Sequence, residues 1–147
     1  MSVLPEASST LLPPDYKPTE KEKFMNPVMT EYFRQKLLAW RHELLNESNE
    51  TIKEMQEDNL QKPDIADRAS AETDHGLELR IRDRERKLIS KINSAMEKIA
   101  EGTYGYCEET GEPISIGRLE ARPIVTLSLE AQERHERKER TQRDMRE

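Results

Sequence analysis

Apolar residues recur at helical spacing in two long stretches of the chain. In residues 29–60 they follow one another at intervals of four, three and four, which places them on one stripe of a helix: Phe33, Leu37, Trp40 and Leu44. In residues 68–101 the same kind of spacing runs further: Leu77, Ile81, Arg84, Leu88, Ile92, Ala95 and Ile99. Polar and charged residues fill most other positions, so each stretch predicts a long amphipathic helix.

Residues 61–68 interrupt this pattern and predict a turn. Pro63 disfavours a helical conformation at the residue before it. Asp64 and Asp67 then lie where a second helix would begin, and acidic side chains there can cap free N–H groups. Two long helices joined by a short turn predict an antiparallel hairpin. At ~1.5 Å per residue, arms of about 30 residues would measure roughly 45 Å.

The segment before the first helix is rich in proline, which resists helix interiors. We therefore expect residues 1–28 to form an extended or disordered leader. A few of its apolar side chains could attach it to a folded surface: Leu11, Leu12, Tyr16 and Phe24.

Two further segments follow the second helix. Gly102 suits the end of that helix, and residues 102–126 are rich in glycine and proline, as in a small irregular or β-hairpin module. Residues 127–147 combine strong helix formers with almost no apolar face, which predicts a solvated C-terminal helix. The predicted fold is therefore mainly α, with an antiparallel coiled-coil hairpin over residues 29–101, a small module and a terminal helix.

Composition narrows the function classes. Of the 147 residues, 33% are hydrophobic and 37% are charged, so a single large core is not expected. The net charge of −6, with acids and bases interleaved, disfavours direct DNA binding through a basic face. No apolar run approaches the roughly 18 residues that a membrane span needs, and the N-terminus does not resemble a signal peptide. One cysteine allows no internal disulfide. We expect a cytoplasmic protein.

Two charged features are candidate interaction sites. Asp64 and Asp67 either cap the second helix or carry negative charge to a distant site, where it would act on Mg²⁺, basic side chains or phosphates. Basic residues of the second helix align in a stripe at ~100° per residue: Arg80, Arg84, Lys87, Lys91 and Lys98. This stripe is either a solvated flank or a ridge that docks on an acidic partner or an anionic ligand. No catalytic motif is present, so we do not expect an enzyme.

Residues 102–126 have the turns of a zinc finger without its ligands. A structural zinc site needs four ligands, usually from two C-x-x-C pairs. Cys107 stands alone, and the other three ligand positions hold residues that do not bind structural zinc: Thr110, Ser128 and Ala131. His135 does not complete a tetrahedral set. We therefore expect no metal, and interpret Cys107 as a packing residue, with a redox or metal role as the alternative.

Four segments together resemble the DksA/TraR family. The sequence FRQKLLAWRHEL resembles the start of the family's first arm, and LELRIRDRERKLISKI resembles its second arm. PDIADRA carries the tip pattern D-x-x-D-x-A through Asp64, Asp67 and Ala69. YGYCEETGEPISIGRLEARP resembles the finger, and the resemblance spans about residues 29–135 in collinear order.

This resemblance implies a monomeric regulator that binds RNA polymerase rather than DNA. Family members insert the hairpin through the secondary channel, and the tip acids act near the catalytic centre. Open complexes at sensitive promoters, such as those for ribosomal RNA, become shorter-lived, and the alarmone ppGpp strengthens the effect. Docking is then expected from the basic stripe at Arg80, Arg84 and Lys87.

Alarmone contacts map by resemblance onto Leu88, Lys91 and Arg122, which match the family. A basic residue usual just after the last cysteine is Gln132 here, which puts the strength of the ppGpp response in question. The loss of all ligand cysteines but Cys107 implies a zinc-independent member of the family.

Two other functions remain open at the level of sequence. A coiled-coil scaffold that dimerises through the apolar seam would differ in its size in solution. A channel factor that assists transcript cleavage would differ in its activity on backtracked complexes, although the tip pattern and the finger remnant favour the DksA type.

Overall fold

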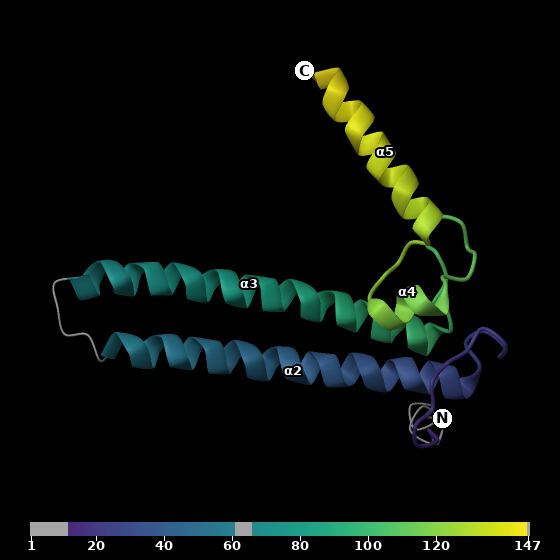
Figure 1. The fold of residues 1–147 in the computed structure, drawn as a ribbon, viewed down its shortest axis with the longest axis horizontal. Coiled ribbons are helices and arrows are strands. Elements are labelled where there is room, and N and C mark those ends of the chain that lie inside the picture. The colour runs from purple at the N-terminus through teal and green to yellow at the C-terminus, as the bar shows by residue number, and fades with distance from the viewer. Residues whose placement is uncertain (1–11, 61–65, 147) are drawn as a thin grey trace. The chain divides into compact units, whose positions relative to one another are not determined.

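The computed structural model describes residues 12–60 and 66–146, and these residues are mainly helical (Figure 1). Its helices are α2 (Pro27–Leu60), α3 (Ala66–Glu101), α4 (Ile116–Ala121) and α5 (Leu129–Arg146). Two compact units are distinguished: residues 37–94, and the preceding and following parts of the chain together. Within the described residues, no helix combines the length and apolar character needed to cross a membrane.

In residues 37–94, the two arms of the predicted hairpin run antiparallel. Arg41 donates to Asn93 over 2.6 Å, and Arg82 donates to Asn49 over 2.8 Å. Moving forward along α2 therefore means moving back along α3, and Figure 1 shows the two helices side by side. The predicted mainly α fold with a helical hairpin is confirmed.

The predicted seam is buried at some positions and open at others. Leu37 and Ile92 are fully buried, and Ile52 is 4% exposed. Leu77, which the spacing also assigned to the seam, is 37% exposed, and Leu45 is 41% exposed. The apolar stripe of α2 turns polar over its second half, so α3 has less apolar surface to pack against there.

Both long helices begin two residues earlier than expected. In α2, Pro27 occupies the first helical position, where its missing N–H is not needed. The Asn26 side chain accepts a hydrogen bond from the Met29 N–H over 3.0 Å and so caps the helix. In α3, the helix includes Ala66.

The unit that contains the start of α2 also contains the end of α3 and the module that follows. Its core is formed by side chains from α2, the module and α4, all at most 4% exposed: Met29, Phe33, Tyr104, Ile114 and Leu119. The rings of Phe33 and Tyr104 lie 5.8 Å apart. The Tyr104 hydroxyl donates to the Pro123 carbonyl over 2.8 Å, which closes the module on itself.

The module contains a helix that the sequence analysis does not predict. The chain leaves α3 through Gly102 and forms one bridge between Tyr106 and Pro113. The short helix α4 then begins after Ser115, whose hydroxyl accepts from the Arg118 N–H over 3.3 Å. Six residues are too few to produce a periodic pattern, which explains why the helix is not apparent in the sequence.

The described part of the leader, residues 12–26, folds back onto this unit. Tyr16 packs edge-on against Tyr32 at 5.7 Å, and Phe24 against Tyr106 at 5.2 Å. Gly105, at a φ of 92°, faces Phe24 so closely that an added Cβ would lie 3.0 Å from that ring. Attachment through Tyr16 and Phe24 is thus confirmed, while Leu11 lies outside the described residues.

Candidate functional site

The tip pattern falls largely outside the described residues. Asp64 lies in the undescribed segment 61–65. Asp67 and Ala69 belong to the first turns of α3, with side chains that are not described. An acidic residue at the second position of a helix interacts favourably with the helix dipole, so capping and a functional role both stay open for Asp67.

The basic stripe lies exposed on α3. Arg80, Arg84, Lys87 and Lys91 are all solvent-exposed. Lys87 lies 3.0 Å from Asp83, but both side chains are at least half exposed, so this pair is weak. Within the described part of the chain, Arg80, Arg84 and Lys91 have no acidic partner, and their charge is available to another molecule.

Lys98 does not share this property. Its ammonium group pairs with the Glu108 carboxylate of the module. The stripe that remains available is therefore Arg80, Arg84, Lys87 and Lys91.

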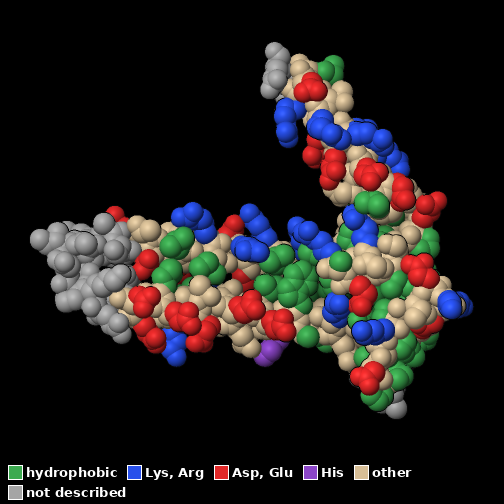
Figure 2. All heavy atoms as spheres, viewed as in Figure 1, with side chains coloured by type: hydrophobic (Ala, Val, Ile, Leu, Met, Phe, Trp, Pro, Cys, Tyr) green, Lys and Arg blue, Asp and Glu red, His purple; other side chains and the backbone are tan. Residues whose placement is uncertain are grey.

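An acidic stripe on α2 was missed by the sequence analysis. It consists of exposed side chains at intervals of four, three, four and three: Glu43, Glu47, Glu50, Glu54 and Glu57. Figure 2 shows Asp and Glu side chains along α2, and Lys and Arg side chains along α3 with some acids between them. The hairpin therefore carries an acidic stripe on α2 and a basic stripe on α3, and the spacing of both is visible in the sequence.

The residues assigned to ppGpp by resemblance belong to different units. Leu88 is half-buried and Lys91 exposed, both on the α3 part of residues 37–94. Arg122 is exposed and directly follows α4 in the other unit. Its backbone N–H donates to the Arg118 carbonyl over 2.9 Å, so its backbone is fixed to that helix. Gln132, on α5, donates to Glu136 over 3.3 Å.

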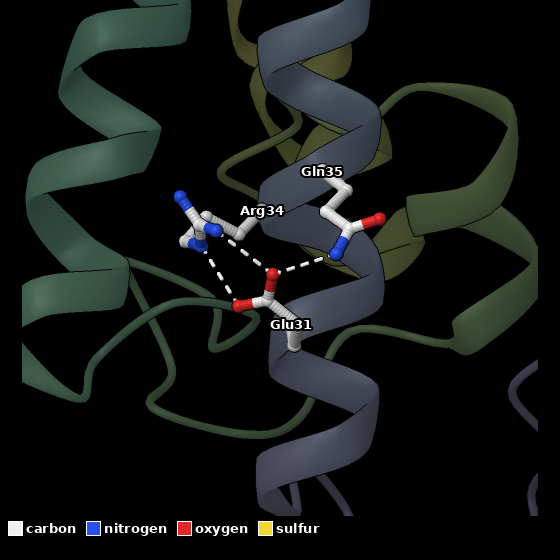
Figure 3. A network of polar contacts seen from close by, with 3 residues as sticks. All are labelled: Glu31, Arg34 and Gln35. Atoms are coloured by element: carbon white, nitrogen blue, oxygen red, sulfur yellow. Dashed lines mark hydrogen bonds and ion pairs between the residues drawn. The ribbon is translucent and has the colours of Figure 1, made fainter. Parts of the chain in front are cut away.

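A buried carboxylate near the start of α2 is a further feature that the sequence analysis missed. Glu31 is 4% exposed and accepts hydrogen bonds from Arg34 Nε, Arg34 Nη2 and Gln35 Nε2, each over 2.8 Å (Figure 3). The bonds from Arg34 lower the pKa of Glu31 against the opposing effect of burial. The residues follow the helical i, i+3, i+4 spacing, but sequence alone does not tell that Glu31 is buried.

A second polar cluster joins α2 to α4. The Glu120 carboxylate accepts from the Tyr32 hydroxyl over 2.6 Å and from Lys36 Nζ over 3.0 Å. Burial, followed by the bond to Glu120, raises the pKa of Tyr32 to about 12. The partners are 88 and 84 positions apart in the chain, so no local signal links them.

The four expected ligand positions do not form a metal site. Cys107 is 3% exposed, and Ser128 instead caps α5 by accepting from the Ala131 N–H over 3.2 Å. Burial acts to raise the pKa of the Cys107 thiol, but hydrogen bonds from Thr110 and Ser128 outweigh it and lower the pKa to about 6. His135, the remaining candidate, pairs with Glu109. Among the described residues, no group of three metal-binding side chains comes together.

Two family models match the chain. Residues 29–99 match the N-terminal domain of the DnaK suppressor protein DksA, and residues 102–137 match the prokaryotic dksA/traR C4-type zinc finger. The second match implies zinc, yet Thr110, Ser128 and Ala131 do not supply the thiolate or imidazole donors that zinc needs. The module therefore keeps the finger's sequence pattern without its donor set.

Named relatives cover most of the chain. It is 62% identical to the RNA polymerase-binding transcription factor DksA of Caulobacter vibrioides, over 88% of this chain and 92% of the relative. It is 44% identical to the protein of the same name from Escherichia coli K12, over 78% and 76% respectively. The solved structure of transcription factor DksA2 from Pseudomonas aeruginosa is similar, with 41% identity, a TM-score of 0.71 and coverage of 82% and 94%. With a hairpin, a finger-like module and relatives that share them, this chain belongs to the DksA family.

Proposed function

We propose that this protein is a transcription regulator that binds RNA polymerase through the secondary channel and destabilises open complexes at sensitive promoters. The observation that carries the proposal is the exposed basic stripe on one arm of a long helical hairpin, with Arg80 and Arg84 free of acidic partners in the described chain. The names of the relatives, which state RNA polymerase binding, supply the partner. Action in the cytoplasm follows from that partner.

Docking is assigned to the basic stripe of α3, and action is assigned to the tip pattern. The stripe at Arg80, Arg84 and Lys87 supplies charge for docking on acidic groups of the polymerase. Asp64, Asp67 and Ala69 then reach the catalytic centre, where negative charge acts on Mg²⁺ or on basic side chains. No direct DNA contact is needed, which agrees with a net charge of −6.

The alarmone ppGpp is proposed as a co-effector at the polymerase surface. Lys91 and Arg122 are exposed cations that suit a polyphosphate, and Leu88 is a half-buried apolar neighbour of Lys91 on α3. Gln132 carries no charge where a family member carries a basic residue, so a weaker response than that of such members is expected. No metal takes part in this proposal, and the protein acts as a monomer.

Binding to purified RNA polymerase core, followed by transcription from a ribosomal RNA promoter with and without ppGpp, tests this function. We expect a stable complex, shorter open-complex lifetimes and a further decrease with ppGpp. Failure to bind the polymerase would refute the proposal. Transcript cleavage in backtracked complexes would instead assign the protein to the cleavage-factor class, and a dimer in solution would favour the scaffold alternative.

A further inference from the structure

The helix α4 depends on its surroundings for stability. Isolated helices shorter than about 12 residues are marginal in water, and α4 has six. Ser115 caps its N-terminus, and two of its side chains, Ile116 and Leu119, are buried in the core. These contacts hold one edge of the helix and leave its outer edge to be fixed by other groups.

Glu120 links the partly exposed side of α4 to α2. Its carboxylate is held by Tyr32 over 2.6 Å and by Lys36 over 3.0 Å, both from α2. Within the described chain these are the polar contacts that join α4 to α2. Burial acts to raise the pKa of Glu120, but the bonds from Tyr32 and Lys36 outweigh it and lower the pKa. Glu120 is therefore charged at neutral pH.

Tyr32 is itself held in place by aromatic contacts. Its ring lies edge-on to Phe33 at 5.2 Å and to Tyr16 of the leader at 5.7 Å. Lys36 Nζ lies 5.8 Å from the centre of the same ring. These contacts hold the Tyr32 ring, and the hydroxyl of that ring donates to Glu120 of α4.

The position of Arg122 depends on the position of α4. It lies two residues after Glu120, and its backbone N–H is bonded to the Arg118 carbonyl of α4 over 2.9 Å. Its side chain is exposed and has no acidic partner among the residues described. A shift of α4 would therefore redirect the Arg122 guanidinium.

We infer that Tyr32, Lys36 and Glu120 form a positioning cluster, which orients Arg122 toward the phosphates of ppGpp on the polymerase. The inference rests on the proposed function, in which Arg122 contacts that ligand. The three residues would not touch ppGpp themselves. They hold α4 so that the arginine presents its donors in one direction, and a fixed guanidinium binds phosphate better than a mobile one.

The test uses the full-length protein bound to RNA polymerase, with open-complex lifetime measured over a ppGpp titration. Tyr32→Phe removes only a hydroxyl, and Glu120→Ala removes the carboxylate. We expect each to raise the ppGpp concentration for half-maximal effect by about three- to tenfold, the range expected for loss of a hydrogen bond. Polymerase affinity without ppGpp should change by less than about twofold, because neither residue belongs to the basic stripe that is assigned to docking.

Two controls separate positioning from a general loss of stability. Glu112→Ala removes an exposed acid of the same module whose carboxylate makes no hydrogen bond or ion pair in the described structure, and it should leave the response unchanged. In the Arg122→Ala background, Glu120→Ala should cause no further loss, because a residue that acts only through Arg122 has nothing left to position.

Each outcome has a distinct meaning. Additive losses in the double variant, or variants that match Glu112→Ala, would overturn the positioning cluster while leaving the proposed function intact. An equal loss of polymerase affinity with and without ppGpp would also overturn it, since that result describes a merely structural role. A wild-type protein that fails to bind the polymerase would refute the proposed function itself.

Discussion

At the residue scale, the module contains one thiol, Cys107, and none of the other cysteines that a four-cysteine zinc site requires. Cys107 is buried, and the side chains and N–H groups of Thr110 and Ser128 act on it as hydrogen-bond donors. These donors favour the thiolate, whose pKa is about 6. Hydrogen-bond donors thus surround the Cys107 thiol in the segment that matches the C4-type zinc finger.

The first prediction concerns the pH dependence of stability. A free thiol has a pKa of about 8.5, whereas the folded protein has the pKa of Cys107 at about 6. A depressed folded pKa gives stability that is fully present above pH 8.5 and is lost as the pH falls through 6. Relative to Cys107→Ser, the wild-type free energy of unfolding should fall over this window by up to about 3 kcal/mol.

Denaturant unfolding of both proteins at several pH values measures this difference. Serine does not titrate in the window, so the variant supplies the baseline. Parallel pH profiles would show that the thiolate contributes nothing to folding. Polymerase regulation at neutral pH should survive in Cys107→Ser, and its loss in a folded variant would support a redox or thiol role.

A second prediction concerns the tip acids. Asp67→Asn, alone or with Asp64→Asn, should preserve polymerase binding and abolish the effect on open-complex lifetime. At ~1.5 Å per residue, Asp67 lies about 20 Å along α3 from Arg80, so docking and action can be separated. Asparagine is itself a good cap, and loss of the dipole interaction should cost at most ~1 kcal/mol.

Affinity and open-complex lifetime are measured on the same preparations, with thermal melting as a check on folding. If the double variant still shortens open-complex lifetimes as the wild type does, Asp64 and Asp67 are only helix caps. The proposed mechanism would then lack its active group.

At the element scale, α2 carries an acidic stripe and α3 carries a basic stripe beside acids of its own. The acids of α2 follow one another at intervals of four and three, with Lys53 as the one base between His42 and Leu60. Four exposed bases of α3 follow similar intervals: Arg80, Arg84, Lys87 and Lys91. Like charges at these spacings destabilise a helix slightly. Each stripe is therefore better suited to binding a partner than to stabilising the hairpin.

The third prediction tests the basic stripe. Arg84→Ala or Lys87→Ala should weaken polymerase binding by about three- to tenfold and flatten its salt dependence, because a screened charge contact is lost. Arg86→Ala is a matched control, since it removes the same charge from the same helix about 200° around from Arg84. Arg86 is 74% exposed, so its removal should not affect folding.

Dissociation constants of the polymerase complexes, measured at several salt concentrations, test this prediction. An unchanged affinity and salt slope in Arg84→Ala, or an equal effect in Arg86→Ala, would make the stripe a solvated flank. Melting temperatures are needed alongside, because Arg84 also occupies a position of the seam repeat.

At the scale of the whole molecule, the module of residues 102–126 is held by contacts with other segments. The start of α2 supplies Phe33 against Tyr104, and the leader supplies Phe24 against Tyr106 and Gly105. Buried side chains of α4 and the Tyr104 bond to Pro123 complete the packing. The module is therefore folded by apolar burial from segments far away in sequence.

The fourth prediction follows from this packing and from the donor set. Purified protein should contain far less than one zinc per chain, and its melting temperature should not change in the presence of a chelator. Elemental analysis and thermal melting with and without EDTA measure both quantities. Zinc near one equivalent, or melting upon chelation, would contradict the prediction and would require ligands other than Thr110, Ser128 and Ala131.

Local sequence determined the long helices, because apolar spacing, a proline turn and capping residues act within a few positions of one another. Phe33 and Leu37 belong to the apolar spacing that predicts the first arm, and Ile92 belongs to the spacing that predicts the second. All three are buried. The lone Cys107 likewise excluded a four-cysteine metal site from the residue types alone.

Only the tertiary structure decided which polar side chains meet. Tyr32 and Glu120 are 88 positions apart, and neither shows any sign of its partner in the surrounding sequence. The same holds for Phe24 against Gly105 and for the burial of Glu31. Helical periodicity is a local property of the chain, whereas these contacts exist only once the leader, α2 and the module have packed around one core.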